Sequence, residues 1–237
     1  VSSADGIYAY NLLNIEGGSF DITCKGSSST SAKAIKSDGT VSISEGSFVI
    51  NATDDGIHSN SIVQINGGTI KIESSDDAIH ADGLAEINDG TYDITAAEGI
   101  EATYVKINKG SITISASDDG INAGNKSSKY SVTVEINGGN ITIKMGSGDT
   151  DGIDSNGNLY INGGTINITG NSPFDYDGEA KYTGGKMIVN GEETTTITNQ
   201  MMGGGNMPGG NMPNGNQGNM QQGGEVNDNR HGMRGRR

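Results

Sequence analysis

One phrase recurs along the chain at a nearly constant spacing. Asp55–His58 returns as Asp77–His80, Glu98–Glu101, Asp119–Asn122 and Asp151–Asp154. The third residue of the phrase is always isoleucine, and successive copies lie 21 or 22 residues apart until an insertion lengthens the last interval to 32. A fixed period of this length is typical of a solenoid, in which each copy stacks on the one before it.

Each copy of the phrase is followed by two short runs in which apolar and polar residues alternate, as in Val63–Ile65 and Thr69–Ile72. Alternation with a period of two indicates strands with one buried face. Asn66-Gly67-Gly68 separates these runs, and glycine suits a corner that needs a positive φ. Three short strands per period predict an all-β fold, a right-handed parallel β-helix of about eight coils. We also expect the corner asparagines to be buried and to form a hydrogen-bonded ladder.

Composition agrees with a thin core. Only 32% of the 237 residues are hydrophobic and 5% are aromatic, with no tryptophan, so a thick layered core is excluded. We expect the β-helix domain to cover residues 1–198, with an inserted loop at Asn125–Lys129. Residues 199–237 are rich in glycine, asparagine and methionine and have a basic end, which predicts a flexible tail.

The net charge of −14 restricts the possible partners. An acidic surface repels phosphate backbones, so we expect no binding to nucleic acid. No stretch approaches the roughly 20 apolar residues of a membrane span, so membrane insertion is not expected. An acidic body instead favours divalent cations.

The recurring phrase places acids at equivalent positions of successive coils. Carboxylates stacked about 4.8 Å apart repel each other unless a cation neutralises them. Ca²⁺ takes six to eight oxygen ligands, so one ion between two coils can reach carboxylates on both. The alternative is a solvated acidic edge that resists aggregation. The best predicted calcium site comprises Asp77, Glu98, Glu101, Asp118 and Asp119, and the further candidates are Asp54, Asp55, Asp76, Asp151 and Asp154.

His58 and His80 follow the inward isoleucines directly, so we expect their column to point outward. They offer a zinc pair without a third histidine or cysteine nearby, which favours an ordinary polar face. No nucleophile, base and acid stand apart from the repeat, so catalysis is not expected. A lyase would need a basic lysine above the acids, and Lys36 and Lys106 are predicted to face outward instead. The candidate sugar contacts are Tyr104, Tyr160, Lys106, His58 and His80.

The phrases Asp54–His58 and Ile65–Ile70, together with the tail composition, give the chain a family resemblance. Over about residues 5–190 it resembles the bacterial β-helical carbohydrate-binding domain family of cellulolytic anaerobes. That resemblance implies a fold similar to polysaccharide lyase family 9, bound calcium, and binding to cellulose or acidic pectin-type sugars without clear lyase activity.

The expected function is therefore that of a secreted or cell-surface bacterial module that binds calcium and plant cell-wall polysaccharide, cellulose or polygalacturonate, without catalysis. Two alternatives remain open. One is a structural cell-surface protein stiffened by calcium, and the other is a calcium-dependent pectate lyase.

Overall fold

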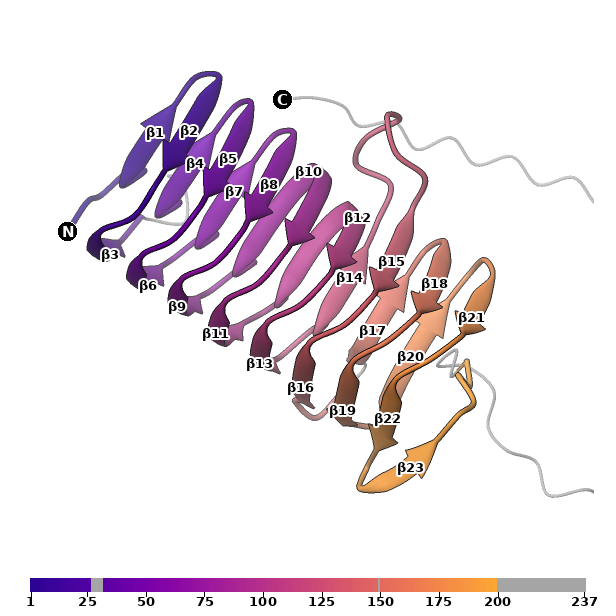
Figure 1. Ribbon diagram of the computed structural model, residues 1–237. Helices are drawn as coiled ribbons and strands as arrows, with labels where there is room; N and C mark the ends of the chain where they lie inside the picture. Colours follow the sequence, from indigo (N-terminus) through magenta and orange to yellow (C-terminus); the bar gives the residue numbers. More distant parts are fainter. Residues whose placement is uncertain (27–31, 149, 200–237) are drawn as a thin grey trace, which may run out of the picture. The chain divides into compact units, whose positions relative to one another are not determined.

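The computed structural model describes residues 1–26, 32–148 and 150–199, and within them every regular element is a β-strand. Parallel strands stack as a β-solenoid (Figure 1). Eight strands succeed one another along the main path of the larger sheet, which amounts to about seven turns. The predicted parallel β-helix is thus confirmed. No helix among the described residues is long and apolar enough to cross a membrane.

Each coil contributes three strands, and the first two belong to one 14-stranded sheet. In two coils they merge into one long strand, β10 (Ile79–Ile87) and β12 (Ile100–Ile107). The separate first strands are β1 (Ile7–Ala9), β4 (Ile35–Ser37), β7 (Ile57–Ser59), β14 (Ile121–Ala123), β17 (Asp151–Ser155) and β20 (Ser172–Tyr176). The separate second strands are β2 (Leu12–Ile15), β5 (Thr40–Ile43), β8 (Ile62–Ile65), β15 (Thr133–Ile136), β18 (Asn158–Ile161) and β21 (Ala180–Tyr182).

The third strands form a separate nine-stranded sheet. They are β3 (Ser19–Cys24), β6 (Ser47–Ala52), β9 (Thr69–Ser74), β11 (Thr91–Ala96), β13 (Ser111–Ala116), β16 (Asn140–Met145), β19 (Thr165–Thr169) and β22 (Lys186–Val189). All of them pair in parallel, and β23 (Glu192–Thr194) then pairs antiparallel with β22. This reversal covers the C-terminal edge of the sheet, because a strand of opposite direction takes the place of the next rung.

The core is a set of apolar columns. Ile57, Ile79, Ile100, Ile121 and Ile153 lie in register on successive first strands and are fully buried. Branched side chains of one kind stacked in this way pack densely without aromatic bulk. This arrangement explains how a chain with so few hydrophobic residues buries a continuous core.

Glycines occupy two tight places in the coil of β7 and β8. Gly56 precedes the inward isoleucine, where an added Cβ would lie 2.7 Å from the Ala78 carbonyl oxygen of the next coil. Gly68 occupies the corner after β8 with a φ of 104°, the left-handed region in which other residues are strained. The positive φ predicted for this corner is confirmed.

The predicted asparagine ladder is also present. Asn88 Nδ2 donates to Asn66 Oδ1 at 2.8 Å, Asn108 Nδ2 to Asn88 Oδ1 at 2.8 Å, and Asn137 Nδ2 to Asn108 Oδ1 at 3.0 Å. The expectation that these asparagines are buried is wrong, since all are exposed or half-buried. Their corner faces solvent because the glycines after them turn the chain at the outer edge of the coil.

The predicted loop at Asn125–Lys129 lies between β14 and β15 and projects from the stack (Figure 1). The expected boundary at residue 198 falls where the described residues end, and the chain divides by its contacts into residues 1–203 and 204–237. The predicted flexible tail, residues 199–237, lies outside the described residues except for Asn199.

Candidate functional site

The recurring phrase builds two polar columns along the corner before and within the first strands. The first column holds the residue two positions before each inward isoleucine, and the second holds the residue just after it. In the second column, β-pairing aligns His58 with His80, His80 with Glu101, Glu101 with Asn122, and Asn122 with Asp154. The first column contains Asp55, Asp77, Glu98, Asp119 and Asp151.

The stacking of acids that the period predicts is therefore confirmed. Backbone hydrogen bonds link the first column directly, because Gly56 N donates to Asp77 O and Gly99 N donates to Asp119 O. Asp76 and Asp118 precede this column by one residue and are exposed, whereas Asp54 at the equivalent position is half-buried. All ten predicted metal ligands thus lie along one corner of the solenoid.

A lysine neutralises the first acids of the column. Lys33 Nζ lies 2.7 Å from Asp54 Oδ1 and 2.6 Å from Asp55 Oδ2. Burial lowers the pKa of this ammonium, but the two carboxylates outweigh it and raise the pKa overall. Lys33 therefore remains charged and occupies the position in which a cation was expected between these acids.

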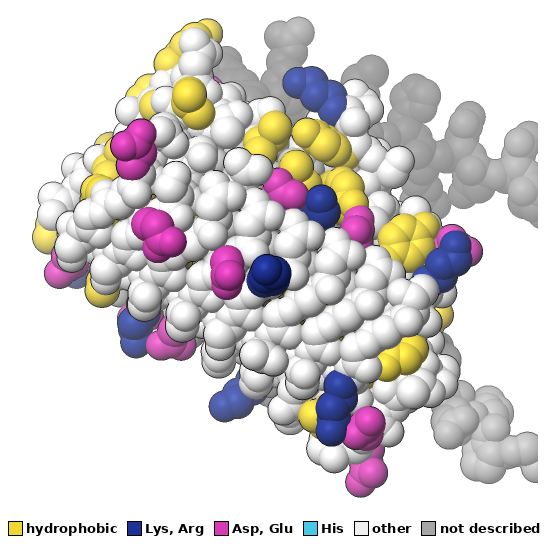
Figure 2. Space-filling model, in the orientation of Figure 1, with side chains coloured by type: hydrophobic (Ala, Val, Ile, Leu, Met, Phe, Trp, Pro, Cys, Tyr) yellow, Lys and Arg dark blue, Asp and Glu magenta, His cyan; other side chains and the backbone are white. Residues whose placement is uncertain are grey.

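The two histidines bind acids rather than solvent. His58 Nδ1 lies 2.7 Å from Asp55 Oδ2, and His80 Nδ1 lies 2.6 Å from Asp77 Oδ2. Their rings stack with centroids 4.7 Å apart. Each of the two histidine residues is only 9% exposed to solvent. Figure 2 shows no histidine on the face in view.

The second column is more buried than an outward-facing column would predict. Ile57, His58 and Ser59 are all buried, and so are Ile100 and Glu101. The burial arises because the stacked polar side chains cover one another and contact the first column. The sugar contacts predicted for His58 and His80 lack an exposed ring.

Glu101 joins the network from the next rung. Its Oε2 lies 2.8 Å from His80 Nδ1, and its Oε1 lies 2.6 Å from Lys126 Nζ. These cations lower the pKa of Glu101 to about 2 against the desolvation that burial causes. Desolvation, together with the neighbouring Glu101 carboxylate, raises the pKa of Asp77 to about 7, and the two acids raise that of His80 to about 10. His80 and Lys126 are thus the cations that neutralise this network.

Further along the columns the cations stop. No lysine, arginine or histidine of the described residues forms a salt bridge with Glu98, Asp119 or Asp154. Burial and neighbouring acids raise the pKa of Glu98 to about 8, of Asp119 to about 6 and of Asp154 to about 7. We call these three residues, with Asp151, the acid-rich group.

Asn122 lies within the acid-rich group, on the same column as Asp154. Its Nδ2 donates to Glu98 Oε2 at 3.0 Å, while its Oδ1 is buried without a hydrogen-bond partner. A buried acceptor that lacks a donor costs free energy. Carboxylate and amide oxygens are the ligands that Ca²⁺ prefers.

The remaining predicted sugar contacts lie on the second strands. Tyr104 is half-buried, bonds Glu135 through its hydroxyl and meets the Tyr130 ring edge-on at 6.4 Å. Tyr160 bonds Glu179 and lies under the Lys181 ammonium. Lys106 pairs with Glu86 at 3.2 Å. These side chains face away from the core, but their polar atoms are already engaged.

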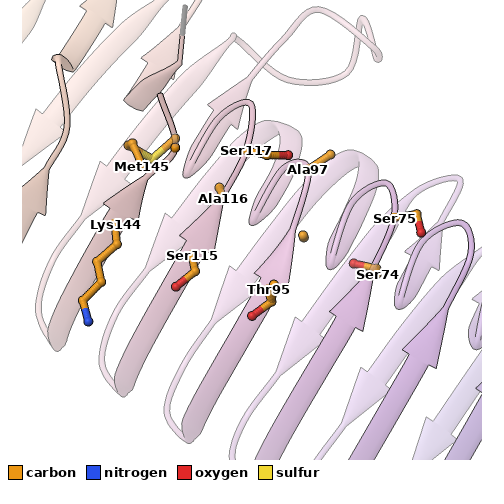
Figure 3. Close-up of a pocket in the computed structure, with 11 residues that line it drawn as sticks. Ser74, Ser75, Thr95, Ala97, Ser115, Ala116, Ser117, Lys144 and Met145 are labelled. Atoms are coloured by element: carbon orange, nitrogen blue, oxygen red, sulfur yellow. The ribbon is translucent and has the colours of Figure 1, made fainter. Parts of the chain in front are cut away.

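A shallow groove of about 550 Å³ crosses four coils where the third strands end (Figure 3). Its lining is small and hydroxyl-rich, and Lys144 and Met145 stand at one end. The groove borders the acids directly, because Ser75, Ala97 and Ser117 immediately precede Asp76, Glu98 and Asp118 in the chain. Its lining residues include Ser74, Ser75, Thr95, Ala96, Ala97, Ser115, Ala116 and Ser117.

Sequence reasoning missed Lys126 and the groove. Thr103 Oγ1 accepts the backbone N–H groups of Lys126 and Ser127 at 2.9 and 2.8 Å, which folds the inserted loop back over the acids. Nothing in the repeat signals this return, since the loop interrupts it. The sequence contains one weak indication of the groove, which is the small residue that recurs before the acids, as at Ser75, Ala97 and Ser117.

The fold and this corner define a β-solenoid with an acidic column beside an open groove. A family model described as "Carbohydrate-binding domain-containing protein" matches residues 1–78 and 76–203. The chain belongs to this carbohydrate-binding domain-containing family. Searches of curated proteins and of solved structures gave no significant match.

Proposed function

We propose that this protein is a secreted, non-catalytic module that binds an acidic polysaccharide of the plant cell wall with the help of Ca²⁺. Membership of a carbohydrate-binding family supports the polysaccharide partner. The groove is the observation that supports the position of the polysaccharide-binding site. It runs across four coils, and its lining residues precede Asp76, Glu98 and Asp118 in the chain. A polymer lying across the coils meets the hydroxyls of Ser74, Thr95 and Ser115 on three successive rungs and Lys144 on the fourth.

The acidic character of the sugar follows from the charges around the groove. Neutral sugars are usually held by stacking on exposed aromatic rings, and the groove lining contains none. A uronate chain instead finds Lys144 at one end and, along the acids, ions that bridge carboxylate to carboxylate. Cellulose is also tested below, because the exposed Tyr8 and Tyr10 on the first coil offer aromatic surface for a neutral sugar.

The acid-rich group is the proposed calcium site. Glu98, Asp119 and Asp154 have raised pKa values and no cationic side chain, and Asn122 adds an unused oxygen. Calcium bound there would remove the repulsion between rungs. Asp54, Asp55, Asp77 and Glu101 are less suited, because Lys33, His80 and Lys126 already neutralise them.

The same pairing argues against lyase activity. A lysine that removes a proton next to a uronate carboxylate must be neutral when it acts. Lys36, in register with His58, pairs with Asp5 at 3.7 Å. Lys33 and Lys126 contact Asp54, Asp55 and Glu101, and these carboxylates raise the pKa of both lysines. Each is therefore held as an ammonium and is a poor base.

The test is binding to polygalacturonate, to cellulose and to neutral pectin side chains, with Ca²⁺ and with excess chelator. We expect calcium-dependent binding to polygalacturonate, with no unsaturated product. Lys144→Glu should weaken it about tenfold, since a charge-assisted contact in the groove becomes a repulsion. Lys109→Glu makes the same charge change at an exposed corner outside the groove and serves as the matched control.

Three results would contradict this function. If excess chelator leaves polygalacturonate binding unchanged, calcium has no part in the binding. If Lys144→Glu and Lys109→Glu lose the same amount of affinity, the groove is not the binding site. Calcium-dependent stabilisation of the fold without binding to any of the glycans would favour the structural alternative instead.

A further inference from the structure

Three ligand atoms from two neighbouring rungs converge on one point beside β10 and β12. Asp77 Oδ2 and Glu101 Oε2 lie 2.6 and 2.8 Å from the same nitrogen, His80 Nδ1. The three residues are 5–9% exposed, and their ligand atoms all lie within 4.8 Å of one another. Two carboxylates and an imidazole therefore share one buried centre.

The atoms that face away from this centre are occupied. His80 Nε2 lies 3.3 Å from Asp82 Oδ1, and Lys126 Nζ lies 2.6 Å from Glu101 Oε1. A histidine that binds a metal usually donates its other ring N–H to a carboxylate, which fixes the tautomer and directs the free nitrogen at the metal. Asp82 provides that partner, so His80 Nδ1 is oriented as a ligand.

Protons hold the apo cluster together imperfectly. One Nδ1–H has one direction, yet two carboxylate oxygens lie within hydrogen-bond distance of that nitrogen. A cation at the centre would satisfy all three groups at once, because a metal accepts a lone pair from each. The convergence is thus explained better by a metal ion than by a single shared proton.

The ligand types select the metal. Ca²⁺ and Mg²⁺ take oxygen ligands, whereas Zn²⁺ and its first-row neighbours accept imidazole nitrogen together with carboxylate oxygen. Three protein ligands also leave a tetrahedral ion one open position. We propose that Asp77, His80 and Glu101 bind a divalent transition-metal ion of the Zn²⁺ class, at a site separate from the calcium of the acid-rich group. This inference is independent of glycan binding.

The test uses the full chain after removal of metals with chelator. Zn²⁺ binding is followed by calorimetry, and Co²⁺ serves as a spectroscopic probe through its visible absorption. We expect binding with release of one or two protons per ion, because the ligands must be deprotonated. Excess Ca²⁺ should leave the Co²⁺ spectrum unchanged.

The variants separate ligands from neighbours. His80→Gln should abolish the Co²⁺ spectrum, and Asp82→Asn should weaken Zn²⁺ binding about tenfold or more. His58→Gln distinguishes this site from its neighbour, because Asp55, His58 and His80 also converge within 4.8 Å and the two histidine rings stack. Asp154→Asn should leave Zn²⁺ binding intact.

Equal losses in His80→Gln and His58→Gln would overturn the assignment, and so would displacement of Co²⁺ by Ca²⁺. If His80→Gln fails to fold, the wild-type protein decides the question by ¹⁵N NMR of its imidazoles. A shift of the His80 Nδ1 resonance on addition of Zn²⁺ supports the site, and an unchanged resonance overturns it.

Discussion

The two ends of the acid columns have the same origin in the repeat but opposite electrostatics. In the coils of β7, β10 and β12, the carboxylates of Asp55, Asp77 and Glu101 each contact a lysine or histidine. In the acid-rich group, Glu98 and Asp154 lack such a partner among the described residues and have pKa values of about 8 and about 7. One repeat therefore yields both a self-neutralised segment and a segment whose acids Glu98, Asp119 and Asp154 have no cationic partner among the described residues.

The largest effect should come from removing the cation of the neutralised segment. Lys33→Ala leaves Asp54 and Asp55 facing each other without their ammonium, so we expect a loss of about 3 kcal/mol in the free energy of unfolding. Chemical denaturation measures it, and Lys109→Ala, at an exposed corner, should stay within about 0.5 kcal/mol of wild type. A loss below about 1 kcal/mol would mean that the pairing contributes little to the fold.

The next test is pH, in the presence of chelator. Glu98, Asp119 and Asp154 have pKa values raised above those of the unfolded chain, so the folded state keeps protons that the unfolded state releases. Their contribution to stability is present at low pH and is lost as the pH rises through about 6 to 8. We expect the melting temperature to fall by about 5 °C or more between pH 5.5 and 8.5.

Calcium sharpens the same experiment. An ion bound to the ionised carboxylates of the folded protein stabilises it by mass action, so millimolar Ca²⁺ should remove most of the decline. His80, with its pKa of about 10, adds a loss above pH 6.5 that calcium should leave in place. A melting temperature that rises with pH without calcium would refute the assigned pKa shifts.

A smaller effect is expected from neutralising one acid of the acid-rich group. Glu98→Gln should raise the stability of the apo protein at pH 8 by about 1 kcal/mol, because a like charge between rungs disappears. The same variant should weaken calcium binding in a calorimetric titration. Asp93→Asn, on the exposed face of the nine-stranded sheet beside Lys71, should lack both effects.

The smallest difference should appear at the asparagine ladder, where neutral amides link the rungs. Asn88→Ala and Asn137→Ala each remove ladder hydrogen bonds, at a cost of about 1–2 kcal/mol. We expect the two losses to agree within about 0.5 kcal/mol, measured by denaturant unfolding with and without calcium. A calcium-dependent difference between them would show that the contrast between the two segments extends beyond the acid columns.

The period alone predicted the stack, the inward isoleucines, the corner glycines and the alignment of acids, because a regular rise converts sequence spacing into spatial neighbourhood. It could not predict which acids find cations. Lys126 arrives from a loop outside the repeat, and the burial of His58 and His80 depends on side chains that cover one another. Alternation within one strand predicts which face a residue lies on. It does not predict whether side chains from neighbouring coils cover that residue.

The loop that delivers Lys126 has a further consequence. It lies between β14 and β15, and the coils on either side pair without it, since β12 contacts both strands directly. Replacing the loop thus offers a way to retune the charge balance at Glu101 while every rung keeps its place. In a solenoid of this kind the stacked strands set the geometry of the acid columns, and an inserted loop sets their charge balance. The two can therefore change independently.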